Sequence, residues 1–174
     1  EISACLVGSE MCIRDSNYTA STRLILKQCG LSDEDIDNRL IKVHGEASNN
    51  DIIFGVEDNA GIKKEHVFLR KAYNIKYKAL NFSELYDRIK SVAIFGHSLG
   101  ETDHTYFNKL FQESCMYNKF STNNNKEFWL FYYKENGYHC MMQQLDSLTH
   151  NSLTSFRQYN RVNFINTDKE KVFI

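Results

Sequence analysis

The sequence lacks several features by which whole classes of proteins are recognised. It has no apolar run near the roughly 18 residues of a membrane-spanning helix, and no cationic head followed by an apolar core as in a signal peptide. It has no excess of one charge either, because the formal net charge is -1 and acidic and basic residues are interspersed. We therefore expect a cytoplasmic protein that contacts neither a membrane nor nucleic acid through a basic patch.

Paired cysteines and prolines are missing as well. The 5 cysteines form no C-x-x-C pair and are odd in number, which favours reduced thiols over a disulfide framework. The absence of proline points to no function by itself. Neither His97 with His104 nor His139 with Cys140 and His150 completes a set of metal ligands, so we expect no metal site.

The start of the chain looks foreign to the rest. The stretch from Leu6 to Ser16 matches the translation of a transposon-type sequencing adapter. We therefore predict that residues 1–16 are an adapter-derived artefact outside the fold. Residues 17–174 are then expected to be the C-terminal portion of a single α/β domain of a longer protein.

Short apolar runs alternate with helical periods from Asn17 onward. Apolar and turn residues predict strands over residues 40–43, 52–54, 92–95, 128–133 and 162–165. Apolar residues at steps of three and four predict helices over 21–28, 75–89, the stretch around 106–111, 141–148 and 153–159. This alternation predicts a Rossmann-like, mostly parallel sheet flanked by helices.

Ligands of parallel α/β sheets collect at the carboxyl ends of the strands, so the loops that follow strands carry most information. Four loops are rich in polar groups, and their joint occurrence is the signal. They are Asn17-Tyr18-Thr19, His44-Gly45, Gly55-Val56-Glu57-Asp58, and the turn from Gly96 to Asp103.

The turn Gly96-His97-Ser98-Leu99-Gly100 fits two chemistries. As G-x-S-x-G it matches the nucleophile elbow of serine hydrolases, and Asp146 and His150 would complete the Ser, Asp, His order along the chain. However, Asp146 and His150 are four residues apart in one helical stretch, whereas hydrolases take these partners from separate loops. The alternative is a nucleotide-binding turn, in which Ser98 contacts a ribose or a phosphate.

The loop motifs also resemble those of a known family. Asn17-Tyr18-Thr19, Val43-His44-Gly45, Ile53 to Asp58 and above all Ile94 to Asp103 resemble, in order and spacing, the motifs of the bacteriophage abortive infection AbiH family. The resemblance extends from Asn17 to the end of the chain. AbiH in turn resembles the sirtuin-like (SIR2-like) NAD-binding domains, which implies a truncated SIR2-like fold here.

The resemblance implies a bacterial defence protein that shuts down a phage-infected cell and binds NAD or a related nucleotide, either as a ligand or as the substrate of an NAD glycohydrolase. Asn17 would orient the nicotinamide ribose or a water, and His44 would be the general base. The implied nucleotide contacts come from Tyr18, Gly45, Gly96, His97, Ser98 and Asp103. Asp103 has an equally good explanation as the N-cap of the next helix.

The family also has a Gly-Asn-Gly-Phe-Asp-type loop that is missing from this sequence. We therefore expect the chain as given to be inactive by itself. A phage-derived trigger and an oligomeric state are compatible with the resemblance. Two other functions stay open at this point: a serine hydrolase that uses Ser98, and a sensor that binds a nucleotide or a phage component without catalysis.

Overall fold

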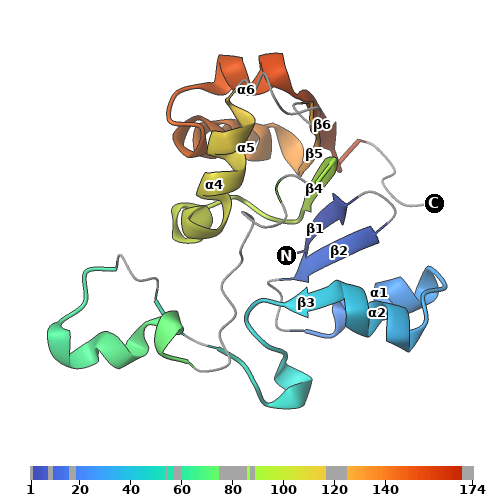
Figure 1. Ribbon diagram of the computed structural model, residues 1–174, viewed down its shortest axis with the longest axis vertical. Helices are drawn as coiled ribbons and strands as arrows, with labels where there is room; N and C mark the ends of the chain where they lie inside the picture. Colours follow the sequence, from blue (N-terminus) through green and yellow to red (C-terminus); the bar gives the residue numbers. More distant parts are fainter. Residues whose placement is uncertain are drawn as a thin grey trace.

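Six strands form one mixed sheet in the computed structural model, in the spatial order β3-β2-β1-β4-β5-β6 (Figure 1). The structure describes residues 2–7, 10–15, 19–53, 55–56, 60–74, 86, 89–116 and 125–169. β1 (Ile2–Val7) is antiparallel to both of its neighbours, β2 (Glu10–Asp15) and β4 (Ser91–Phe95). β3 (Leu40–Lys42) is parallel to β2. As a result, β2, β3 and β4 run in the same direction and end at the same edge.

The second half of the chain adds two parallel strands, β5 (Glu127–Tyr132) and β6 (Arg161–Asn166), beside β4. Three helices follow or separate these strands: α4 (His104–Ser114), α5 (Lys134–Leu148) and α6 (Leu153–Tyr159). Figure 1 shows these helices gathered on one side of β4, β5 and β6. Right-handed crossovers between strands added in one direction place their helices on the same face.

The main core lies between those helices and the sheet. Alternate residues of β4 and β5 are buried, and their partners on the helices include Leu110, Phe111 and Phe156, each 0% exposed. The rings of Phe111, Phe128 and Phe156 contact one another, with centroids 4.8 to 5.6 Å apart. This aromatic cluster fixes how α4 and α6 pack on β5 and therefore where the loops at the strand ends lie.

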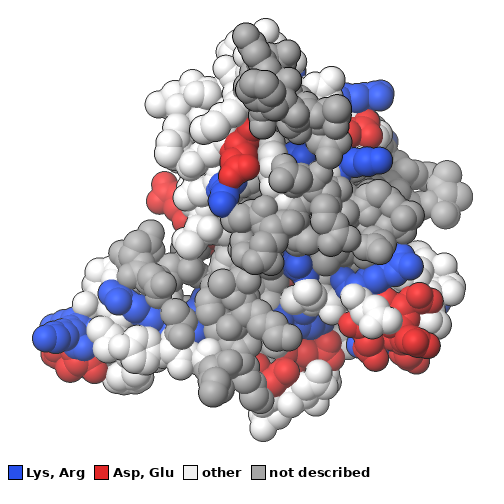
Figure 2. Space-filling view, in the orientation of Figure 1, with Lys and Arg blue, Asp and Glu red and all other residues white. Residues whose placement is uncertain are grey.

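A smaller core lies beneath α1 (Ser21–Gln28) and α2 (Asp33–Arg39), where Ile13, Leu26 and Ile36 pack together. α2 begins at an N-cap, since the Ser32 hydroxyl accepts a hydrogen bond from the Asp35 N–H at 3.1 Å. Acidic side chains gather over these helices in Figure 2, with basic ones beside them. Lys27, for example, lies 2.8 Å from Asp33.

Short 3-10 helices occupy much of the remaining chain. They are Ala47–Asn49, Lys64–Leu69, Lys71–Tyr73 and Glu101–Asp103. The green segment that contains residues 64–73 projects away from the sheet in Figure 1. In the described part of the chain, no helix is long and apolar enough to cross a membrane.

Most predicted elements are confirmed within a few residues. The helix over 21–28 and the strands at 40, 92, 128 and 162 are present, although α5 begins at Lys134 rather than at Met141. The predicted strand over 52–54 is not formed at Ile52 and Ile53, where the Ile53 N–H bonds the His44 carbonyl oxygen in an irregular segment, and Phe54 lies outside the described residues. Pairing nearby is limited to an isolated bridge between Val56 and Arg70. The predicted helix over 75–89 lies, apart from Tyr86 and Ile89, outside the described residues.

The first residues also differ from expectation. Residues 1–16 were expected to lie outside the fold, whereas the structure pairs Ile2–Val7 and Glu10–Asp15 within the sheet. Ile13 of β2 is buried against Leu26 and Ile36, which gives this pairing an apolar contact. That these residues derive from a sequencing adapter stays a prediction, because strand pairing does not show their origin.

Candidate functional site

The turn over residues 96–103 connects β4 to α4 at the carboxyl edge of the sheet. Gly96 (φ 64°) and Leu99 (φ 55°) both adopt left-handed backbone conformations. The Leu99 side chain is fully buried in the main core, and the Asp103 N–H donates to the Gly100 carbonyl oxygen at 2.8 Å. The buried leucine anchors the turn in this strained form and leaves Ser98 exposed.

His104, the first residue of α4, holds the same turn in place. Its Nε2 lies 3.1 Å from the Leu99 carbonyl oxygen and 2.8 Å from Oε1 of Gln144 on α5. Because both partners are acceptors, Nε2 carries the proton and donates to them. The imidazole therefore fixes the turn relative to α5.

His97 points inward from the turn and is nearly buried. The Leu99 N–H donates to Nδ1 at 2.9 Å, and the ring packs edge-on against Phe107 with centroids 5.2 Å apart. Since Nδ1 accepts, the proton of the neutral ring lies on Nε2. That nitrogen lies 3.4 Å from Oδ2 of Asp103, so His97 presents its N–H to the carboxylate.

Asp103 occupies the N-cap position of α4, as one of its two interpretations predicted, but its side chain makes no capping hydrogen bond. It faces His97 instead. The hydrogen bond from His97 lowers the pKa of the Asp103 carboxyl below its ordinary value against the opposing effect of burial, and the positive charge of Lys71 adds to this lowering. Asp103 is therefore an ionised carboxylate that faces His97.

His44 follows β3 and reaches the same place from the other half of the sheet. Its side chain is buried, and its ring packs edge-on against that of Tyr106 on α4 with centroids 6.0 Å apart. This ring contact brings the segment after β3 to α4, the helix that directly follows the turn over residues 96–103, so the two predicted loops approach each other in the fold. The sequence predicted this meeting from the strand ends alone.

Gly45 has a packing role that the sequence did not show. Its φ is 73°, and a Cβ at this position would lie 2.1 Å from the backbone oxygen of Asp51. The Asp51 carboxylate also accepts the Glu46 N–H at 2.7 Å. This turn therefore requires glycine so that the chain can fold back beside His44, whether or not a nucleotide approaches it.

Two residues of the site, Lys71 and Tyr106, were not predicted. Lys71 Nζ lies 3.4 Å from the Tyr106 hydroxyl and 5.6 Å from the centroid of its ring. The Lys71 N–H donates to the Val56 carbonyl oxygen at 3.0 Å, and Gly55 allows this approach because a Cβ there would lie 2.5 Å from the Leu69 oxygen. In the sequence, Gly55 was the feature that could have indicated a close approach of the chain near Lys71. Tyr106 was predicted to lie on the buried face of α4, but the spacing of apolar residues did not indicate that its hydroxyl contacts Lys71.

The predicted site includes residues beyond those that the structure describes. Asn17 and Tyr18, and the carboxylates Glu57 and Asp58, lie outside the described residues. Thr19, which follows Tyr18, lies near the end of β3, because its carbonyl oxygen accepts a hydrogen bond from Lys42. Lys42 Nζ also lies 2.8 Å from the buried Asp15 carboxylate and 3.5 Å from that of Glu46.

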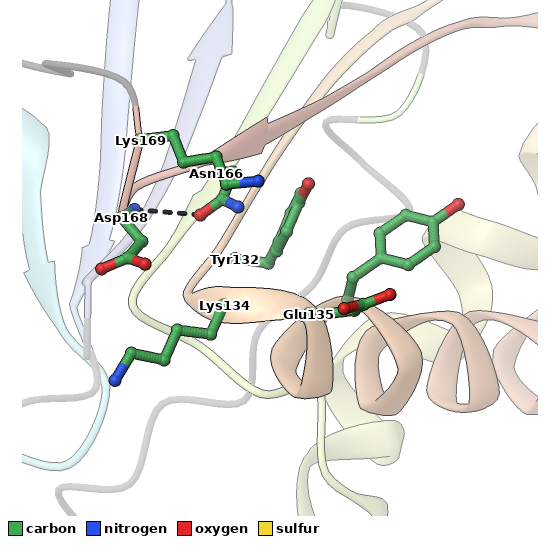
Figure 3. A pocket seen from close by; sticks show the side chains of 7 residues that line it. Tyr132, Lys134, Glu135, Asn166, Asp168 and Lys169 are labelled. Carbon is green, nitrogen blue, oxygen red and sulfur yellow. Dashed lines mark hydrogen bonds between the residues drawn. The ribbon is translucent and has the colours of Figure 1, made fainter.

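Two pockets lie at the carboxyl ends of the parallel strands, and the smaller one adjoins the turn. One, of about 260 Å³, is lined by Gly96, His97 and Ser98 on one side and by the start of α5 on the other. The second, of about 480 Å³, lies over the ends of β5 and β6 (Figure 3). Tyr132 lines both, so the pockets adjoin each other. This edge is where open α/β sheets bind their ligands.

Comparison with known families settles the affiliation of the chain. The family model described as bacteriophage abortive infection AbiH matches residues 4–133.

The chain belongs to the AbiH family.

It is therefore an abortive infection protein, of a family that acts in defence against phage. No curated protein and no solved structure matches the chain.

The AbiH match covers the whole cluster around Asp103. His44, Lys71, His97 and Tyr106 all lie within residues 4–133. Most of the larger pocket lies beyond them, because α5 and β6 follow residue 133. Among the residues that the structure describes, no group of three His, Cys, Asp or Glu side chains could hold a metal ion.

The geometry of this AbiH chain does not assemble the serine hydrolase site. Ser98 and Gly137 of α5 line the same pocket, whereas Asp146 lies nine residues further along α5, about 14 Å at the rise of an α-helix. His150 is exposed and bonds the Gln112 side chain at 2.9 Å. The strained residue of the turn is Leu99 rather than Ser98, unlike the strained serine of a nucleophile elbow.

Asp103→Asn should remove a pH-dependent part of the stability of this AbiH protein. Because the folded pKa of Asp103 is lowered, its contribution is present above the ordinary value of about 3.9 and is lost as the pH falls through the lower folded value. We expect the wild type to be more stable than the variant between about pH 5 and 7, and the difference to shrink below about pH 4.

Urea unfolding across that pH range measures this difference. Asp146→Asn, at an exposed position of α5, is the matched control. A difference between wild type and Asp103→Asn that stays constant down to about pH 3 would contradict the assigned role of Asp103.

Proposed function

We propose that this AbiH family protein binds NAD or a related nucleotide at the carboxyl edge of the sheet and hydrolyses the bond between nicotinamide and ribose. One observation carries the proposal. Two separate segments bring His44 and Lys71 onto Tyr106 of α4, and the turn that precedes α4 holds the His97–Asp103 pair, of which His97 lines a pocket at this edge. A cluster of titratable groups around a buried imidazole is a common arrangement in catalytic sites.

His44 is the proposed general base. Hydrolysis breaks the bond between C1′ of the ribose and the nicotinamide nitrogen, and the oxygen of a water bonds C1′. His44 would accept the proton that this water loses and pass it to solvent, while nicotinamide and ADP-ribose leave. Asn17, by its resemblance to the family motif, would orient the water or the ribose.

The basic groups suit a ligand with phosphates. Lys71 contributes a half-buried ammonium, and Gly96 and Ser98 line the smaller pocket from an exposed turn. A glycine at this point lets the ligand approach the backbone closely. The residues present therefore suit a nucleotide, and Tyr18, Gly45, His97 and Asp103 would contact it as the resemblance of the loop motifs implies.

The proposed function also includes a relationship to SIR2-like domains, a trigger and an oligomeric state. A relationship to SIR2-like NAD-binding domains would explain a nucleotide site at the ends of parallel strands. A phage-derived trigger and assembly into oligomers would then control when NAD is consumed. These parts of the proposal rest on the resemblance of the loop motifs.

The test is to incubate the natural full-length protein with NAD and to measure nicotinamide and ADP-ribose by chromatography. We expect both products in equal amounts, together with loss of NAD in phage-infected cells that express the protein. Unchanged NAD and no bound nucleotide would overturn the proposal. Protection against phage with NAD bound but not consumed would make the protein a sensor and overturn the catalytic part.

A further inference from the structure

The larger pocket, over the ends of β5 and β6, has the groups needed to hold a purine nucleotide. Its volume of about 480 Å³ lies within the range of small-molecule sites. It is built from three adjoining elements: the end of β5, the first turn of α5 and the end of β6 with the turn beyond. Figure 3 shows the labelled side chains on either side of this hollow.

Two tyrosines form an aromatic wall. The rings of Tyr132 and Tyr138 lie with centroids 5.3 Å apart, and Tyr138 also packs edge-on against Phe164 at 5.3 Å. Both tyrosines line the pocket. Rings held by neighbours in this way offer a rigid surface on which a base can stack.

Asn166 presents an amide beside these rings. Its Oδ1 accepts the Asp168 N–H at 3.0 Å, shown as the dashed line in Figure 3. That bond orients the side chain and leaves the second lone pair of Oδ1 and the two amide N–H donors for a ligand. An asparagine amide pairs with N6 and N7 of adenine through one acceptor and one donor, so adenine is the base that it suits.

Charges of both signs complete the pocket. Lys169 supplies an ammonium group for a phosphate and extends toward Tyr132 in Figure 3, whereas the Lys134 ammonium lies 4.8 Å from the centroid of the Tyr133 ring. Glu135 and Asp168 supply carboxylates that accept hydrogen bonds from ribose hydroxyls. The N–H groups of the first turn of α5 favour the same phosphate.

We propose that this pocket binds an adenosine 5′-phosphate group. If the proposed function is correct, a dinucleotide would place its adenosine half here and extend past Tyr132 into the smaller pocket. Its reactive half would then lie at His97 and His44. This orientation rests on the proposed function, whereas binding of adenosine 5′-phosphate to the larger pocket does not.

The test titrates this chain with AMP and with adenosine by calorimetry. We expect AMP to bind more tightly than adenosine, and Lys169→Met to remove most of that preference. Asn166→Asp keeps the acceptor for the Asp168 N–H but loses the amide donors, and it should weaken AMP binding at least about tenfold. Lys109→Met, at an exposed position of α4, is the matched control and should bind AMP as the wild type does.

The outcomes separate this inference from the proposed function. Absence of saturable AMP binding, or equal binding by the wild type and both pocket variants, would overturn it. Urea unfolding of each variant shows whether weakened binding reflects loss of the fold, and only a variant as stable as the control counts as support. NAD hydrolysis by the full-length protein that is unaffected by both variants would overturn the placement of the adenosine half. AMP binding at this pocket without any NAD hydrolysis would support the pocket and overturn the proposed function.

Discussion

His44→Gln is expected to lower the rate of NAD hydrolysis by the full-length protein about 100- to 10,000-fold. Glutamine keeps a polar side chain of similar length but cannot accept a proton from water near neutral pH. The His44 ring is buried and packs edge-on against the ring of Tyr106 on α4. The loss should therefore be in kcat, with little change in KM.

His66→Gln is the matched control, because His66 is an exposed histidine of the 3-10 helix Lys64–Leu69. It should hydrolyse NAD as the wild type does. Steady-state rates and NAD binding by calorimetry together separate catalysis from binding. A His44→Gln variant with unchanged kcat, or one that has lost NAD binding along with its rate, would contradict the role of His44 as a base.

Lys126→Met is expected to lower the free energy of unfolding of the chain by about 2–4 kcal/mol. Lys126 is 1% exposed at the start of β5. Its ammonium donates to the carbonyl oxygens of Tyr86 at 2.6 Å and Ile89 at 2.8 Å, and it lies 3.9 Å from the centroid of the Tyr86 ring. Methionine fills the space but leaves both carbonyl groups without that donor.

The neighbouring change Lys90→Met tests whether loss of a lysine by itself matters. Lys90 is exposed, so this variant should remain within about 0.5 kcal/mol of the wild type. Lys126→Arg, which keeps a cation and several donors, should fall between the two. Urea unfolding measures all three, and a Lys126→Met variant as stable as Lys90→Met would show that the buried ammonium contributes nothing.

The elements that sequence patterns predicted are those whose packing is local and repetitive. α4 has its apolar residues at helical spacing, and its buried face has the residues that this spacing indicates. β4 was recognised as an unbroken apolar run between turns. The stretch over 52–54 has similar composition, but the Ile53 N–H bonds the His44 carbonyl oxygen instead of a neighbouring strand. Composition alone does not show which partner a short apolar run will find.

The candidate site was likewise predicted only in part from the sequence. The family motifs and the rule that ligands collect at strand ends predicted His44 and the turn from Gly96 to Asp103, and the fold brings them together. The sequence did not show whether the Asp103 carboxylate would face His97 or cap the N-terminus of α4, because both lie within a few residues of Asp103.

By itself, the sequence determined the order of the strands and helices from β4 to β6, the family, and the loops that carry polar groups, since each of these depends on residues close together in the chain. Only the tertiary structure decided that Lys71 and Tyr106 join His44, and that β5 and β6 end in a second pocket. The physical reason is that such contacts join segments separated by tens of residues, and backbone pairing and core packing set their distances.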